Sequence, residues 1–177
     1  MQVKTIVGRP LSRRLRRWQF LRLATVPLVS ALSLAAAPAV HADEPVQASG
    51  TFTISYSPTS LRAADGNVFF DYTFSEQMLG TLSGTRVGSG SAVIHPDGSL
   101  NTSNSGIFTG TIAGASGTAE MSFWGSGTFA SAGGSYVVTH GTGGLDGVHA
   151  EGKDSGSATG PTSFAGTYSF KVVFSAS

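Results

Sequence analysis

The chain has no cysteine, and this absence excludes a disulfide scaffold, a thiolate metal site and a cysteine nucleophile. It also lacks an apolar run long enough to span a bilayer as a helix. The candidate run, residues 23–37, contains Pro27 and is shorter than the roughly 20 apolar residues that such a helix needs.

The first 42 residues have instead the composition of a signal peptide. A basic segment precedes the apolar run, and Val40-His41-Ala42 follows it as a cleavage motif. The basic residues are Lys4, Arg9, Arg13, Arg14, Arg16, Arg17 and Arg22. We expect residues 1–42 to engage the export machinery and to be cleaved off between Ala42 and Asp43. The mature protein is expected to be secreted or periplasmic. Residues 16–22 also resemble a twin-arginine signal, so the general and twin-arginine routes both remain open.

Basic residues are scarce in the rest of the chain. Seven of the eleven Lys and Arg, and none of the ten Asp and Glu, precede residue 43, so residues 43–177 carry four basic and ten acidic side chains and a formal charge of −6. Because nucleic-acid binding requires clustered Lys and Arg, we predict no nucleic-acid partner.

Residues 43–177 are rich in glycine and have short runs in which apolar and polar residues alternate, the pattern of antiparallel strands. We predict a flexible lead-in over 43–49 and one domain over 50–177. The predicted strands cover 51–56, 68–74, 84–94, 100–112, 118–124, 135–140, 148–157 and 167–174. The predicted connections are 58–67 after Pro58, Pro96-Asp97-Gly98, 113–117, Gly133-Gly134 and 141–147.

About eight antiparallel strands are enough to close a barrel, so the predicted fold is all-β, a single antiparallel barrel, with a β-sandwich as the alternative. The side chains in inward phase would line a lumen able to bind a small apolar ligand. These candidates are Phe70, Tyr72, Phe74, Met121, Phe123, Tyr136, Phe170 and Phe174.

Three polar residues are candidates for acid–base chemistry. His140 is in strand phase with Tyr136 and would face inward, while His149 and Glu151 lie two residues apart on one strand face. Solvent-facing polar residues give the same spacing. Glu120 is expected on the outer face, and no established ligand motif is matched, so we predict no metal and no cofactor.

Several glycine-rich motifs resemble a family of uncharacterised small bacterial proteins, a domain of unknown function grouped with allene oxide cyclase-like barrels. The motifs are Gly88-Ser89-Gly90-Ser91-Ala92, Pro96-Asp97-Gly98-Ser99, and the stretches 106–117, 143–152 and 166–170. The resemblance covers residues 48–175 and implies a fold, because the family has no agreed catalytic residues. Many members have a histidine near the strand end that here carries Trp124. Allene oxide cyclases and dirigent proteins, which share the fold, shape a reactive substrate in an apolar cavity.

The sequence therefore favours an exported barrel that binds a small apolar ligand and is not an enzyme. One alternative is a cyclase or isomerase that uses the same cavity. The other is an envelope structural protein that associates through its hydroxyl-rich outer face, for example as a homo-oligomer.

Overall fold

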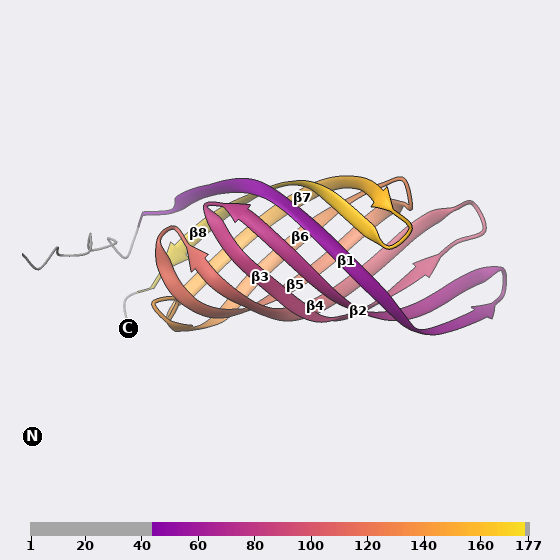
Figure 1. Ribbon diagram of the computed structural model, residues 1–177, viewed down its shortest axis with the longest axis horizontal. Helices are drawn as coiled ribbons and strands as arrows, with labels where there is room; N and C mark the ends of the chain where they lie inside the picture. The colour runs from indigo at the N-terminus through magenta and orange to yellow at the C-terminus, as the bar shows by residue number, and fades with distance from the viewer. Residues whose placement is uncertain (1–43, 176–177) are drawn as a thin grey trace, which may run out of the picture. The chain divides into compact units, whose positions relative to one another are not determined.

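The computed structural model describes residues 44–175, in which eight antiparallel strands close into a barrel (Figure 1). Each strand pairs with the next in the chain, and β8 pairs with β1. The strands are β1 (Val46–Ala64), β2 (Asn67–Gly80), β3 (Leu82–Ile94), β4 (Ser99–Ile112), β5 (Ala115–Thr128), β6 (Ser131–Gly143), β7 (Val148–Gly160) and β8 (Ser163–Phe174). The predicted barrel is confirmed and the sandwich alternative is wrong.

The expected signal peptide and its cleavage site between Ala42 and Asp43 lie outside the described residues. Within residues 44–175, no helix has the length and apolar character needed to cross a membrane.

The first strand is longer than the sequence predicted. Residues 46–49, expected in a flexible lead-in, pair with β8, and the barrel therefore begins at Val46. Pro58 does not end the strand, because a register shift between Pro58 and Ser60 accommodates the missing N–H and β1 continues to Ala64. The turn lies instead at Asp65-Gly66, where both residues have positive φ, 52° and 77°.

The predicted turn at Gly133-Gly134 is also wrong, because both glycines lie inside β6 and the chain reverses at Phe129-Ala130. The reason is packing: a Cβ on Gly134 would lie 2.5 Å from the ring of Phe123. The glycine therefore makes room for an aromatic ring inside the barrel. The predicted turn at Pro96-Asp97-Gly98 and the hairpin around it are confirmed.

Inward side chains form two hydrophobic clusters along the lumen. The larger contains residues next to the β2–β3, β4–β5 and β6–β7 turns, among them Leu82, Ile112 and Val148, which are almost completely buried. The smaller lies toward the β1–β2 and β3–β4 hairpins, which extend furthest at the other end of the barrel (Figure 1). It consists of Phe70, Tyr72, Phe74, Ala92 and Leu100. One end of the barrel is therefore packed more extensively than the other.

Where these clusters meet, one row of register partners around the barrel combines aromatic residues with glycine and alanine. Successive Cα partners from β2 to β8 and on to β1 are Tyr72, Gly90, Asn104, Phe123, Tyr136, Gly152, Phe170 and Ala48. Gly90 lies between Tyr72 and Asn104, and its lack of a side chain lets the aromatic ring and the amide approach each other. This row contains Tyr72, Asn104 and Tyr136, three of the polar residues described below.

We expect Gly90→Ala to destabilise the barrel by about 1–3 kcal/mol, because inserting atoms into a packed core forces its neighbours to move. The new Cβ would lie 2.5 Å from Asn104 Cβ and 2.8 Å from Tyr72 Cζ. Urea denaturation measures the change. The matched control is Ser91→Ala at the next, exposed position of β3. Equal stability of the two variants would contradict the packing described here.

Candidate functional site

A cavity of about 90 Å³ lies in the lumen beside the smaller cluster. Its walls are mainly aromatic and aliphatic and include Phe70, Leu100 and Phe123. Phe129 in the β5–β6 turn also lines it, stacks on Phe70 at 6.4 Å between ring centroids, and is 41% exposed. The cavity thus reaches the surface at the end of the barrel that carries this turn, and Phe129 lies at its mouth.

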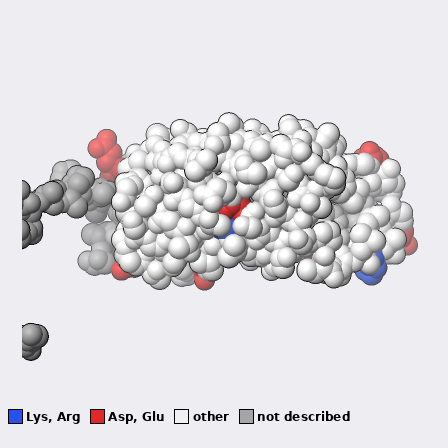
Figure 2. All heavy atoms as spheres, in the orientation of Figure 1, with Lys and Arg blue, Asp and Glu red and all other residues white. Residues whose placement is uncertain are grey.

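Charged and polar residues also line the cavity: Glu76, Arg86, Thr102, Asn104, Tyr136 and Asp154. Figure 2 shows acidic and basic atoms together at the base of a hollow in the middle of an otherwise mostly uncharged face. Apolar walls combined with a few convergent polar groups are typical of small-molecule sites.

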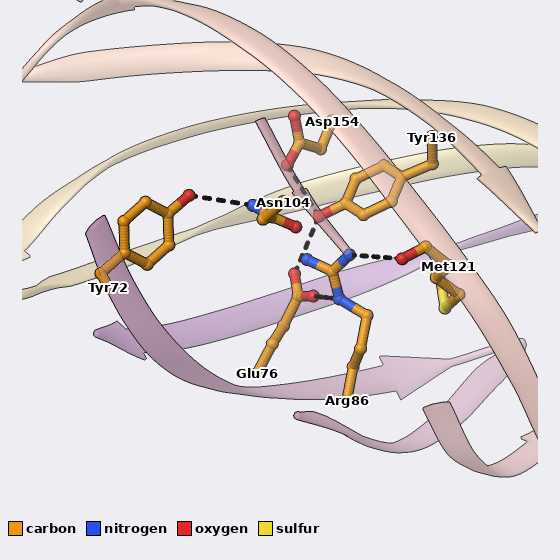
Figure 3. A network of polar contacts seen from close by, with 7 residues as sticks. All are labelled: Tyr72, Glu76, Arg86, Asn104, Met121, Tyr136 and Asp154. Atoms are coloured by element: carbon orange, nitrogen blue, oxygen red, sulfur yellow. Dashed lines mark hydrogen bonds and ion pairs between the residues drawn. The ribbon is translucent and has the colours of Figure 1, made fainter. Parts of the chain in front are cut away.

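The central feature is a fully buried ion pair between Glu76 and Arg86 (Figure 3). The two residues are Cα partners on β2 and β3, and Arg86 Nε donates to Glu76 Oε2 at 2.7 Å. The guanidinium carbon lies 4.5 Å from the ring centroid of Phe74 and 4.9 Å from that of Tyr136. Because Phe74 and Tyr136 belong to β2 and β6, Arg86 connects strands across the lumen.

Tyr136 links this ion pair to a second carboxyl group. Its hydroxyl lies 3.0 Å from Glu76 Oε1 and 3.3 Å from Asp154 Oδ2, and Gly134 N–H donates to the other Asp154 oxygen at 2.8 Å. A phenol has one proton, so it can donate to only one of the two carboxylates at a time. Both contacts become hydrogen bonds when Asp154 is protonated and donates to Tyr136, which in turn donates to Glu76.

The electrostatics agree with this arrangement. Burial raises the pKa of Asp154 to about 6, and the nearby Glu76 carboxylate adds to the shift. Burial, followed by the negative charge of Glu76, raises the pKa of Tyr136 well above its usual value of 10, so the phenol stays protonated at neutral pH. Asp154 is therefore a group in the cavity that can exchange a proton near physiological pH.

A second hydrogen-bond chain fixes the orientation of Asn104. Thr102 Oγ1 donates to the Ser91 carbonyl at 3.2 Å, so Tyr72 O–H donates to Thr102 at 2.7 Å and accepts from Asn104 Nδ2 at 3.2 Å. Each hydroxyl uses its single proton once in this direction. Asn104 Oδ1 consequently faces away from Tyr72 as a hydrogen-bond acceptor.

Two buried side-chain atoms in residues 44–175 have no hydrogen-bond partner within the chain, Arg86 Nη2 and Asn104 Oδ1. Arg86 Nη1 lies 3.5 Å from the Met121 carbonyl, a long contact. Leaving a buried polar group unpaired costs roughly 1–3 kcal/mol. Both residues line the cavity, and the two atoms are one donor and one acceptor without a partner in the described part of the chain.

The predicted lumen residues do face inward, but only four of them line the cavity: Phe70, Tyr72, Phe123 and Tyr136. Phe74 packs on Arg86 next to it. The remaining three belong to the larger cluster, where Met121 and Phe170 are buried and Phe174 is partly buried.

The predicted acid–base residues lie outside the lumen. His140 is exposed because a register shift opposite Ala119 reverses the inward–outward alternation of β6. The backbone of His140 has a φ of +51°, and its Nδ1 lies 3.1 Å from Glu120 Oε2 on the outer face. His149 and Glu151 are also exposed, on the outer face of β7. The inward orientation predicted for His140 is wrong, and the three residues do not meet in a pocket. The outward position predicted for Glu120 is confirmed.

Glu76, Arg86, Asn104 and Asp154 were not predicted from the sequence. Glu76 could have been, because it continues the inward phase of Phe70, Tyr72 and Phe74 toward Met78. A charged residue on the apolar, inward face of a strand indicates a buried ion pair.

We expect Glu76→Gln to destabilise the protein by about 3–5 kcal/mol, because it leaves the Arg86 charge buried without its counter-ion. Urea denaturation at pH 7 measures this, with the exposed Glu151→Gln as the control. Replacing both partners, Glu76→Leu with Arg86→Met, should cost less than the single change. A Glu76→Gln variant as stable as the control would contradict the role assigned to the ion pair.

The raised pKa of Asp154 predicts a pH dependence of stability. The folded protein binds the Asp154 proton more tightly than the unfolded chain does. Protonated Asp154 therefore stabilises the folded state fully below about pH 4, and this stabilisation is lost as the pH rises through about 6. Asp154→Asn, which resembles the protonated acid, should therefore gain stability relative to the wild type between pH 5 and pH 8. Thermal unfolding of both proteins at pH 5 and at pH 8 measures the gain. If the stability difference between Asp154→Asn and the wild type is the same at the two pH values, the raised pKa is contradicted.

No family model and no curated protein match the chain. A search of solved structures finds the crystal structure of a protein of unknown function from the DUF3224 family of Shewanella oneidensis. The two have a TM-score of 0.61 and 17% sequence identity, and the match covers 75% of this chain and all of the other. At this identity the similarity establishes a shared fold, the fold of an uncharacterised domain.

Proposed function

We propose that this protein is an exported binding module whose barrel holds a small, mostly apolar molecule in the cavity beneath Phe129. The observation that carries the proposal is the combination, in one cavity, of aromatic walls with a buried donor and a buried acceptor that have no partner in the chain. Buried polar atoms in folded proteins usually have a hydrogen-bond partner, and these two have none within residues 44–175.

The dimensions limit the ligand to no more than about one ring. An engineered apolar cavity of about 150 Å³ binds benzene. The present cavity measures about 90 Å³ and reaches the surface beside Phe129, so one end of a bound ring could extend into the mouth. The resemblance to allene oxide cyclase-like barrels, whose better-known relatives hold a substrate in an apolar cavity, supports the same function.

Binding is favoured over catalysis for two reasons. The expected acid–base residues His140, His149 and Glu151 lie on the outer surface. Asp154, which does line the cavity, has both carboxyl oxygens hydrogen-bonded, to Gly134 and Tyr136. The expected export is part of the proposal and depends on the sequence of residues 1–42. Native mass spectrometry of the protein purified from its own host would show a retained ligand as an added mass.

A cavity-filling variant tests the location of the site. Ala132 is a partly buried wall residue, and Ala132→Leu should weaken toluene binding at least 10-fold by occupying the cavity. The control is Ala63→Leu, which adds the same atoms at an exposed position of β1 outside the cavity wall. Ligand-observed NMR measures both affinities. If Ala132→Leu binds toluene as well as Ala63→Leu does, the ligand does not occupy this cavity.

A further inference from the structure

The two unpaired atoms in the cavity have opposite hydrogen-bonding characters. Arg86 Nη2 is a donor, because a guanidinium has no acceptor. Asn104 Oδ1 is an acceptor, since the chain through Tyr72 and Thr102 to the Ser91 carbonyl directs the amide nitrogen toward Tyr72. A group that satisfies both must accept one hydrogen bond and donate another.

We propose that the ligand carries an uncharged hydroxyl group at its inner end, which accepts a hydrogen bond from Arg86 and donates one to Asn104. This inference rests on the proposed binding function and adds the chemical class of the ligand. A hydroxyl is the smallest organic group with both a donor and an acceptor, and the whole cavity measures only about 90 Å³.

The charges around the cavity disfavour an ionised ligand. The positive charge of Arg86 is already compensated by Glu76 at 2.7 Å, and Asp154 adds a second carboxyl group that Tyr136 links to Glu76. A carboxylate ligand would bring a further negative charge next to these groups and would offer no donor to Asn104. An ammonium ligand would lie near the Arg86 cation and would offer no acceptor to Nη2. The carboxylate would also lose its hydration without a new counter-ion.

The walls define the other end of the ligand. Phe70, Leu100 and Phe123 offer apolar surface between the polar residues and the mouth at Phe129. Aromatic side chains favour a ring packed against their faces or edges. A small aromatic or alicyclic alcohol therefore meets both the walls and the polar end.

Five probes that share a benzene ring differ in the group that would lie at the inner end of the cavity, and their affinities show which hydrogen-bonding character and charge the site prefers. Toluene has neither donor nor acceptor, benzaldehyde only accepts, benzyl alcohol does both, and benzoate and benzylamine are charged. We expect benzyl alcohol to bind the wild-type protein at least 10-fold more tightly than toluene and several-fold more tightly than benzaldehyde, as measured by NMR titration at pH 7. The comparison among probes needs no variant, so it stays decisive if substitutions in the cavity impair folding.

A variant then assigns the donor interaction to one residue. Asn104→Leu keeps a similar side-chain volume but removes the acceptor, and it should reduce the preference for benzyl alcohol over toluene. Ser105→Ala, at the next, exposed position of β4, should retain the full preference.

The possible outcomes distinguish this inference from the proposed function. If toluene binds as tightly as benzyl alcohol, or if benzoate or benzylamine binds most tightly, the hydroxyl assignment is overturned while binding in the cavity stands. If none of the five probes binds and protein from the native host carries no added mass, the proposed function fails and the assignment fails with it. A preference for benzyl alcohol that Asn104→Leu leaves unchanged would show that Asn104 is not the acceptor.

Discussion

The structure depends on one buried ion pair, formed by Glu76 and Arg86 between neighbouring strands. Removing two charges from water is costly, and their attraction offsets that cost only when the geometry is fixed. The closed sheet fixes it, because the two residues are register partners and the guanidinium lies against the rings of Phe74 and Tyr136. The pair also occupies lumen volume that apolar side chains would otherwise fill, so the hydrophobic core divides into two clusters at this level.

The division of the core explains why the cavity has both its shape and its chemistry. On the side of the larger cluster the lumen is filled, whereas on the other side aromatic residues form walls around unfilled space. Proton donors and acceptors on β2 to β7 then form two chains, one through Tyr136 and one through Tyr72. Each chain uses almost all of its hydrogen-bonding capacity internally. The groups that remain are few and have a defined polarity, which is what a selective small-molecule site requires.

Period-two patterning predicted the strands and most of the inward aromatic residues because alternation follows directly from strand geometry. The prediction from this pattern failed where one residue type can serve two structural roles. Gly134 was interpreted as a turn, although it makes room for a ring and donates its N–H to Asp154. Asp154 itself lies among glycine and serine, where no apolar neighbour marks the inward phase. Its partner Tyr136 lies on another strand, so only the register of the closed sheet brings the two together.

The register shift between β5 and β6 has a further consequence. β6 carries one more residue than β5 between the pairs Thr118–Thr142 and Glu120–Thr139, and this extra residue places His140 in solvent. Loss of one residue at this point would restore the alternation and bring position 140 into the inward phase, opposite Ala119. The direction of a side chain in this scaffold therefore depends on strand length as well as on sequence.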